Sequence, residues 1–178
     1  EIYRDQSQRL HGLIRYVARN STYYRSIFAD HKVDADSILT PDDLRRLPTT
    51  TKDDLQQRNW DFLCVDRSKI AEYTSTSGTL GKPVTIALSV RDLRRLAYNE
   101  AISFSCADGH ADDVYLLMLT LDRQFMAGIA YYEGIRRLGA SVIRMGPGLP
   151  AMQWDAIARL QPTAIVGVPA FIVRLLEY

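Results

Sequence analysis

From residue 114 onward, short apolar runs alternate with amphipathic stretches, and this alternation limits the folds that the chain can adopt. Val114 to Leu121 is a continuous apolar run with the length of a strand buried on both faces. Shorter apolar runs at 141–145 and 163–168 follow it, and stretches of helical periodicity separate the three. Strands that alternate with helices at this spacing are typical of βαβ units. The sequence therefore predicts an α/β fold with a parallel sheet and helices on its faces.

The signals for the helices in this part of the chain agree with that pattern. We expect helices at 125–138, at 152–160 and from Pro169 onward. Gly139 stands just after the first of them, where a glycine commonly ends a helix in the left-handed conformation. Proline is favoured at the first position of a helix, which is where Pro169 stands.

Residues 1–68 have a different character, because they predict short helices and no strand. Leu10, Ile14 and Val17 recur at helical spacing and describe an amphipathic helix. Helix starts follow at Thr40-Pro41-Asp42-Asp43 and at Thr51-Lys52-Asp53-Asp54. Helix N-termini favour negative charge, so we interpret these aspartates as capping residues rather than as a metal or acid-base cluster.

Between these two parts, residues 76–83 read Thr-Ser-Gly-Thr-Leu-Gly-Lys-Pro. They follow an alternation that predicts a short strand from Ile70, and a second strand is expected at 84–88. Glycines let backbone N–H groups approach an anion closely, and hydroxyl and ammonium groups add donors. The pattern predicts a phosphate-binding loop, whose ligands we expect to be Thr76, Ser77, Gly78, Thr79, Gly81 and Lys82.

Two glycine-containing segments, 76–83 and 146–151, each resemble a second nucleotide-binding motif. The 76–83 segment is not a Walker A loop, since Thr76 and Pro83 occupy the positions that decide that motif, although such clusters also occur as plain turns. Residues 146–151 have the spacing of a dinucleotide fingerprint. Their two prolines remove N–H donors, and no acidic residue follows the next strand, which argues against NAD or FAD binding.

The loop resembles the phosphate loop of the adenylate-forming enzymes, which reads Thr/Ser-Ser-Gly-Thr-Thr-Gly-Lys-Pro. Seven of the eight positions fit, and Leu80 replaces a threonine and so removes one hydroxyl donor. Similarity to the phenylacetate-CoA ligase group within this superfamily extends to both sides of the loop. The segments that carry it are 20–25, 47–55, 137–140 and 168–169.

This resemblance implies a function. Such enzymes activate a carboxylic acid with ATP and Mg²⁺, release pyrophosphate, and transfer the acyl group from acyl-AMP to a thiol such as coenzyme A. Kinship with phenylacetate-CoA ligase implies an aromatic acid, and the acyl pocket would include Phe125, Ala127 and Gly128, although Phe125 equally fits an ordinary core position. No residue is assigned as general base or nucleophile, because the carboxylate is itself the nucleophile.

The resemblance also implies an organisation. We expect an N-terminal helical segment, 1–68, and an incomplete α/β nucleotide-binding subdomain, 69–178. The chain lacks an initial methionine and stops within an amphipathic pattern at 171–178, so we expect the N-terminal part of a longer enzyme that is inactive by itself. Its partners would be the carboxylic acid, the remainder of the enzyme and possible second copies in a homodimer. The alternative is a non-catalytic module that binds phosphate or a nucleotide or that forms a dimer interface.

The composition of the chain argues against several other classes of protein. The 22 basic and 21 acidic residues leave a net charge of +1, which offers no field for nucleic acid. The apolar runs are far shorter than the roughly 20 residues that span a membrane. Three scattered histidines give no metal-ligand spacing, so we expect no structural metal site. Cys64 and Cys106 lack paired spacing, which predicts free buried thiols and a cytoplasmic location.

Overall fold

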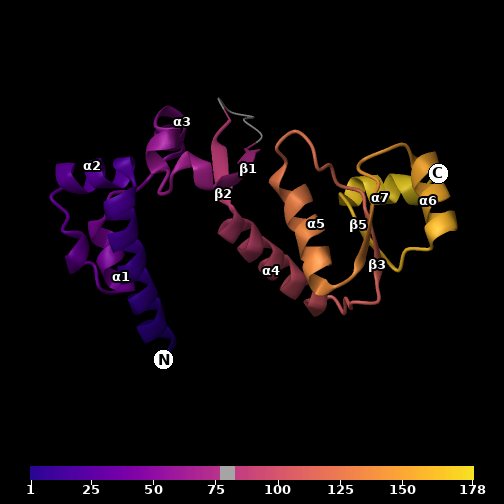
Figure 1. Ribbon diagram of the computed structural model, residues 1–178, viewed down its shortest axis with the longest axis horizontal. Coiled ribbons are helices and arrows are strands. Elements are labelled where there is room, and N and C mark those ends of the chain that lie inside the picture. Colours follow the sequence, from indigo (N-terminus) through magenta and orange to yellow (C-terminus); the bar gives the residue numbers. More distant parts are fainter. Residues whose placement is uncertain (77–82) are drawn as a thin grey trace. The chain divides into compact units, whose positions relative to one another are not determined.

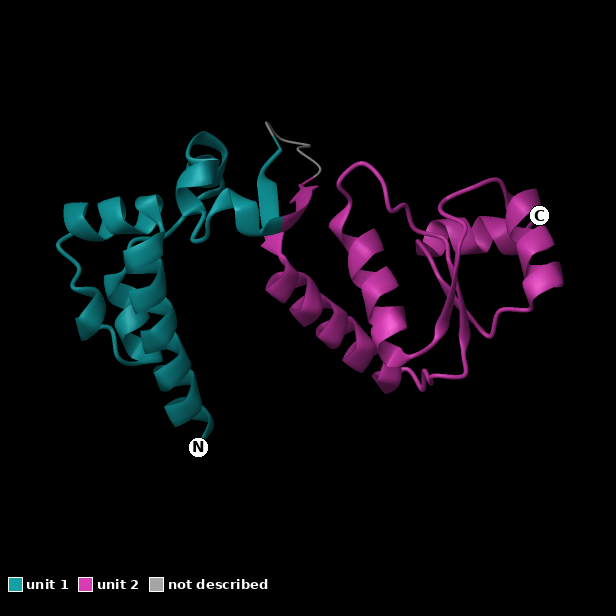
Figure 2. Cartoon of the chain, viewed as in Figure 1, with its two compact units in different colours: residues 1–70, 77–87 teal, residues 71–76, 88–178 magenta. Residues whose placement is uncertain are grey.

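A computed structural model describes residues 1–76 and 83–178 of the chain. The described residues divide into two compact units (Figure 2). Unit 1 contains residues 1–70 and 83–87, and unit 2 contains residues 71–76 and 88–178. Each unit has its own hydrophobic core, so each is described separately below.

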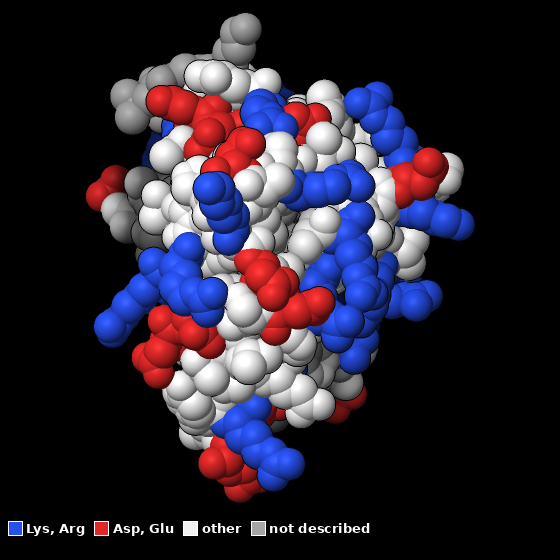
Figure 3. Space-filling model, turned by 90° about the vertical axis from the view of Figure 1, so that its left-hand side faces the viewer, with Lys and Arg blue, Asp and Glu red and all other residues white. Residues whose placement is uncertain are grey.

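Unit 1 consists of helices and short 3-10 turns. Its helices are α1 (Ile2–Asn20), α2 (Thr22–Asp30) and α3 (Lys52–Gln57), and its 3-10 turns are η1 (Ala35–Ser37), η2 (Pro41–Arg46), η3 (Asn59–Phe62) and η4 (Arg67–Lys69). The predicted amphipathic helix is confirmed as α1, whose Ile14 packs with Phe28 and Ile38 in the core. On the face seen in Figure 3, Lys and Arg side chains lie among Asp and Glu side chains. The ion pairs of unit 1 include Arg9–Asp5 and Arg15–Asp36.

Two of the four aspartates at the predicted helix starts, Asp43 and Asp54, are capping residues. Thr51 Oγ1 accepts a hydrogen bond from the amide of Asp54, and the Asp54 carboxylate accepts one from the amide of Thr51 at 2.8 Å. The side-chain hydrogen bond from Thr51, followed by the bond from its amide, lowers the pKa of Asp54. Asp43 likewise accepts from the amides of Leu39 and Thr40. The segment that starts at Pro41, however, is a 3-10 helix rather than an α-helix.

Two strands flank the predicted phosphate loop. They are β1 (Ile70–Ser75) and β2 (Thr85–Ser89), which pair in a two-stranded sheet. At the start of β2, the Asn59 side chain donates to the carbonyl of Thr85 and accepts from its amide, both at 3.0 Å. At the end of β2, Ser89 and Asp92 form a capping box that starts α4 (Val90–Cys106).

The larger sheet in unit 2 confirms the predicted parallel arrangement. Its strands are β3 (Val114–Leu117), β4 (Ser141–Arg144) and β5 (Ala164–Val166), in the order β4-β3-β5. Both pairings are parallel, and Leu116 of β3 lies opposite Ile143 and Ile165. The connections are α5 (Met126–Leu138) and α6 (Pro150–Leu160), and α7 (Pro169–Leu176) follows β5. Gly139 ends α5 with a φ of 92°, which explains the glycine at this position.

Successive residues of β3 serve opposite faces of this sheet. Tyr115 packs with Ile135 of α5 on the face that α4 and α5 cover. Leu116 packs with Ala156 of α6 and Leu175 of α7 on the other face (Figure 1). Because side chains alternate along a strand, one short apolar run fills two cores, and helices on both faces shield the sheet.

Two expectations about this unit need correction. Strand β3 ends at Leu117, four residues before the end of the apolar run. Met118 and Leu119 remain buried, so burial continues past the last residue of the strand. Neither cysteine is buried in the way expected: Cys106 is exposed and Cys64 is half-buried, and both are free. Burial raises the pKa of the Cys64 thiol.

Candidate functional site

The loops that leave the carboxyl ends of the three parallel strands are where an α/β sheet binds its ligands. They comprise residues 118–125 after β3, 145–149 after β4 and 167–168 after β5. The first is the longest, and it leads into α5. It is also the loop that approaches β1, at the end of which the predicted phosphate loop begins.

The 118–125 loop contains a strained turn. Arg123 and Gln124 both have a positive φ, of 56° and 59°. Residues with a Cβ atom rarely adopt this backbone conformation, which costs about 1–3 kcal/mol per residue. Before the turn, the Thr120 hydroxyl donates a hydrogen bond to the Asp122 carboxylate. After it, the carbonyl oxygen of Gln124 accepts a hydrogen bond from the amide of Ser75 at 3.0 Å. The turn therefore presents a backbone acceptor to the last residue of β1.

A cavity of about 90 Å³ lies between this loop and β1. Its lining residues are Glu72, Tyr73 and Thr74 from β1, Leu121, Gln124 and Phe125 from the loop, and Ile129 from α5. Thr74 is almost fully buried, whereas the Phe125 side chain is 42% exposed. The lining of this cavity is partly polar and partly apolar. The Glu72 side chain has no hydrogen bond or ion pair with any residue that the structure describes, so it gives the cavity a carboxyl group without a partner there.

The structure places the predicted phosphate-loop residues only in part. Thr76 directly follows β1 and is exposed. Ser77, Gly78, Thr79, Gly81 and Lys82 lie outside the described residues, so their role stays a prediction. What the described residues add is the position of the start of the loop, which the Ser75–Gln124 hydrogen bond links to the cavity.

The three predicted acyl-pocket residues have different environments. Phe125 precedes α5 and lines the cavity. Ala127 is half-buried in the first turn of α5 and is not among the lining residues. Gly128 is buried, and a Cβ at this position would lie 1.9 Å from the carbonyl oxygen of Thr120. Glycine is required there because α5 packs directly against the backbone of the loop. The assignment of all three to an acyl pocket stays a prediction.

Sequence reasoning missed several residues of this cavity. Glu72, Gln124 and Ile129 line it, and none of them belongs to a motif. The alternation along β1 places Glu72 and Thr74 on one face, which was the available signal. The contribution of Gln124 depends on its left-handed backbone conformation, which the surrounding sequence does not predict.

At the loop after β4, one backbone amide and one side-chain amide are already used by hydrogen bonds within the protein. The amide of Gly148 donates to the carbonyl of Gly146 at 2.9 Å, and the same carbonyl accepts from Gln153 Nε2 at 2.8 Å. Within residues 1–76 and 83–178, no group of three or more His, Cys, Asp or Glu side chains is placed to hold a metal ion. None of the helices in these same ranges is long and apolar enough to span a bilayer.

The known proteins that are similar in sequence to this chain include phenylacetate-coenzyme A ligases. The phenylacetate-coenzyme A ligase of Escherichia coli K12 is 31% identical over 173 residues, which is 97% of this chain and 39% of the relative. The phenylacetate-coenzyme A ligase of Thermus thermophilus is 28% identical over the same share of each chain. The chain thus spans about two-fifths of the length of these relatives.

Solved structures show the same fold. The 2-hydroxyisobutyryl-CoA ligase, crystallised with 2-HIB-AMP and CoA, matches 99% of this chain and 39% of its own with a TM-score of 0.89 and 22% identity. An open conformation of that ligase also gives a TM-score of 0.89. The family model described as AMP-binding enzyme matches residues 21–178, which is most of the chain. The chain therefore belongs to the AMP-binding enzyme family.

Proposed function

We propose that the chain is the N-terminal part of an ATP-dependent ligase that activates a carboxylic acid. The carboxylate oxygen attacks the α-phosphorus of ATP, the bond to the pyrophosphate oxygen breaks, and acyl-AMP and pyrophosphate result. A thiolate, most simply that of coenzyme A, then attacks the acyl carbon and releases AMP. The match of residues 21–178 to the AMP-binding enzyme family is the observation that carries this proposal.

The 76–83 loop would hold the leaving pyrophosphate. Its charge grows as the bond to the α-phosphorus breaks, so donors that are already in place stabilise the transition state most. The hydroxyls of Thr76, Ser77 and Thr79, the amides of Gly78 and Gly81, and the Lys82 ammonium are the proposed donors. Each charge-assisted hydrogen bond contributes about 1.5–3 kcal/mol. The anchored end of β1 supports this assignment because it fixes the point from which the loop starts.

The cavity beside β1 would receive part of the acid. Phe125, Leu121 and Ile129 provide apolar surface that suits an aromatic ring, and Phe125 retains exposed ring surface for stacking. The kinship with phenylacetate-coenzyme A ligases supports an aromatic acid as the substrate class. Glu72 would favour acids that carry a hydrogen-bond donor at the far end, because it has a free acceptor to offer.

The remaining participants follow from the same reaction. Mg²⁺ would enter as the companion of the ATP polyphosphate, whose oxygens are the ligands it prefers. The described residues provide no acidic cluster to hold the ion separately. The solved 2-hydroxyisobutyryl-CoA ligase contains bound CoA, which supports coenzyme A as the acceptor here. We place the reaction in the cytoplasm, where ATP and coenzyme A are supplied.

Binding to the chain itself can be tested by isothermal titration with pyrophosphate. We expect saturable heat from the wild type and at least about tenfold weaker binding by the Lys82→Ala, Gly78→Val double variant, since one lost charge-assisted bond accounts for that factor. Lys69→Ala is the matched control, because it removes a lysine from the same region but outside the loop. Equal heats from all three proteins would overturn the loop assignment.

Turnover requires the full-length enzyme. We expect ATP–pyrophosphate exchange that depends on an added carboxylic acid and that is faster with aromatic acids than with short aliphatic acids. Exchange without any acid would contradict the ligase proposal. Pyrophosphate binding with no exchange by the full-length enzyme would favour the alternative, a non-catalytic phosphate-binding module.

A further inference from the structure

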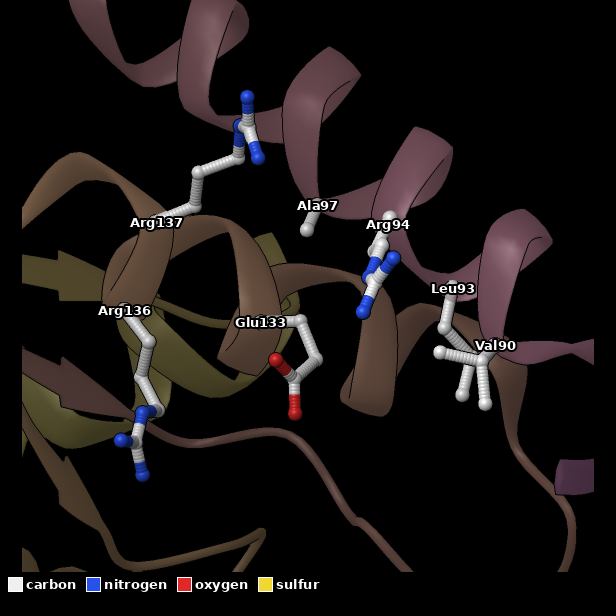
Figure 4. A pocket seen from close by; sticks show the side chains of 7 residues that line it. All are labelled: Val90, Leu93, Arg94, Ala97, Glu133, Arg136 and Arg137. Carbon is white, nitrogen blue, oxygen red and sulfur yellow. The ribbon is translucent and has the colours of Figure 1, made fainter.

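A second cavity, separate from the one beside β1, runs between α4 and α5 and has a volume of about 440 Å³. Helix α4 contributes Val90, Leu93, Arg94 and Ala97, and α5 contributes Glu133, Arg136 and Arg137. Figure 4 shows Arg94 and Arg137 coming from the two different helices, while Arg136 and Arg137 extend in opposite directions. We call this cavity the α4–α5 groove. No step of the proposed ligase reaction uses it.

The walls of the groove are held rigidly. Helices α4 and α5 approach so closely at Gly134 that a Cβ there would lie 2.3 Å from the Cβ of Glu100. The Ser89–Asp92 capping box fixes the start of α4, and the left-handed Gly139 fixes the end of α5. Preformed walls matter for a binding site because little conformational entropy is lost when a ligand enters.

The charge of the groove is not neutralised. Three arginines and one glutamate line the groove, and no ion pair joins Arg94, Arg136 or Arg137 to an acidic residue in the part of the chain that the structure describes. Arginines that do form ion pairs, such as Arg9 and Arg58, lie in other regions of the chain.

Neutral aromatic rings position two of these arginines instead. The Arg137 guanidinium lies over the Tyr98 ring, 5.2 Å from its centre. Arg136 Nη1 donates a hydrogen bond to the Tyr132 hydroxyl at 3.2 Å, and this bond raises the pKa of Arg136. The Arg144 guanidinium lies over the same Tyr132 ring at 5.7 Å. A ring orients a guanidinium without cancelling its charge, so the cations stay available to an anion.

The dimensions indicate the size of the ligand. The groove extends along α4 from Val90 to Ala97, which is about 10 Å at 1.5 Å per residue. Its volume lies within the roughly 300–1,000 Å³ typical of small-molecule sites. This extent suits a small molecule better than a peptide segment, which needs a longer track.

We infer that the α4–α5 groove binds a small phosphorylated anion. Arg94 and Arg137 contact the phosphate from opposite helices, since a guanidinium matches phosphate geometry with two parallel donors. Val90, Leu93 and Ala97 cover the apolar part of the molecule, and Glu133 accepts a hydrogen bond from a hydroxyl or amino group. A nucleoside monophosphate has this combination of groups. The inference rests on unit 2 alone and does not depend on the proposed function.

The test is an NMR titration of the ¹⁵N-labelled chain with AMP, inorganic phosphate and inorganic pyrophosphate in parallel arms. The protein carries Lys82→Ala and Gly78→Val, so binding at the proposed phosphate loop is removed. We expect AMP to shift the amide signals of residues 90–97 and 133–137. Inorganic phosphate is expected to bind more weakly than AMP at these same residues, which would separate a nucleotide site from a general anion site.

Substitutions of the groove arginines test whether they bind the phosphate. Arg94→Ala combined with Arg137→Ala should weaken AMP binding by about tenfold or more, and added salt should weaken it in the wild type. Arg95→Ala is the matched control, because Arg95 is an exposed neighbour on α4 outside the groove. Circular dichroism verifies that each variant is folded. Equal losses from Arg95→Ala and the double variant, or shifts confined to other residues, would overturn the inference.

Discussion

The amide of Ser75 donates a hydrogen bond to the carbonyl oxygen of Gln124, with an N···O distance of 3.0 Å. This bond joins the last residue of β1 to a residue with a left-handed backbone, 49 positions later in the chain. The start of the predicted phosphate loop and one wall of the cavity are thereby positioned together. A change in the 122–124 turn should consequently affect both.

Gln124→Val tests the turn. A β-branched residue tolerates a φ of 59° poorly, so we expect the free energy of unfolding to fall by about 1–2 kcal/mol in a urea titration. Gln124→Gly is the control, because glycine adopts this φ freely and should leave stability within about 1 kcal/mol of wild type. Equal destabilisation by both variants would mean that the side chain of Gln124, rather than its backbone, stabilises the turn.

Gly128→Ala tests the close packing of α5 against the loop. The new Cβ would meet the Thr120 carbonyl oxygen at 1.9 Å, and backbone must move to relieve the overlap. We expect the variant to lose about 1–3 kcal/mol in the free energy of unfolding, measured with urea.

Gly12→Ala is the matched control for that change. Gly12 lies within α1, and a Cβ there would meet no atom within 4 Å. Alanine in place of a helical glycine should stabilise the chain by about 0.5–1 kcal/mol. Opposite signs for these two Gly→Ala substitutions support the packing argument, and a stabilising Gly128→Ala contradicts it.

Asp113 gives a prediction of pH dependence. Its carboxylate accepts a hydrogen bond from the Thr163 hydroxyl at 2.7 Å and another from the amide of His110 at 2.7 Å. The Thr163 bond, and next the His110 bond, lower the pKa of Asp113 from its usual 3.8. A lowered folded-state pKa stabilises the protein above the unfolded-state pKa, and this stabilisation is lost as the pH falls through the folded value.

The corresponding measurement compares melting temperatures between pH 6 and pH 2. Asp113→Asn should melt below wild type at pH 6, and the difference should shrink as the pH falls below about 4. Asp112→Asn is the control, since the neighbouring Asp112 is exposed and has no hydrogen bond within the described residues. A difference that stays constant down to pH 2 would exclude ionisation of Asp113 as its cause.

Phe125→Ala addresses the proposed acyl site in the full-length enzyme. Removing the ring should raise the KM for an aromatic acid by about tenfold, because roughly 1–3 kcal/mol of apolar contact is lost. The KM for ATP should change little, since Phe125 lines the cavity and is not one of the predicted phosphate-loop residues. Parallel rises in both KM values would indicate that the 118–125 loop has collapsed instead.

Local signals predicted the elements well because their causes are local. Gly139, Pro169 and the pairs Thr51–Asp54 and Ser89–Asp92 act within one helical turn, so their effect can be read from neighbouring residues. The end of β3 could not be read in this way. The apolar run continues to Leu121, but strand pairing depends on where β4 and β5 end in space.

The residues of the candidate site could not be predicted from local signals either, because they are brought together from distant parts of the chain. Glu72 and Phe125 line one cavity although 53 positions separate them, and no periodicity links them. The α4–α5 groove depends on the crossing of two helices at Gly134, so its arginines resemble ordinary surface residues in the sequence. Family resemblance predicted the phosphate loop, whereas the surroundings of the start of that loop could be described only from the fold.

The two hydrogen bonds between Asn59 and Thr85 have a further consequence for the edge of β2. One side-chain amide satisfies both the donor and the acceptor of Thr85, just as a neighbouring strand would. An incoming strand from another molecule therefore finds this point of the edge already occupied. Asn59 thereby blocks strand addition at this point of β2, which opposes edge-to-edge aggregation.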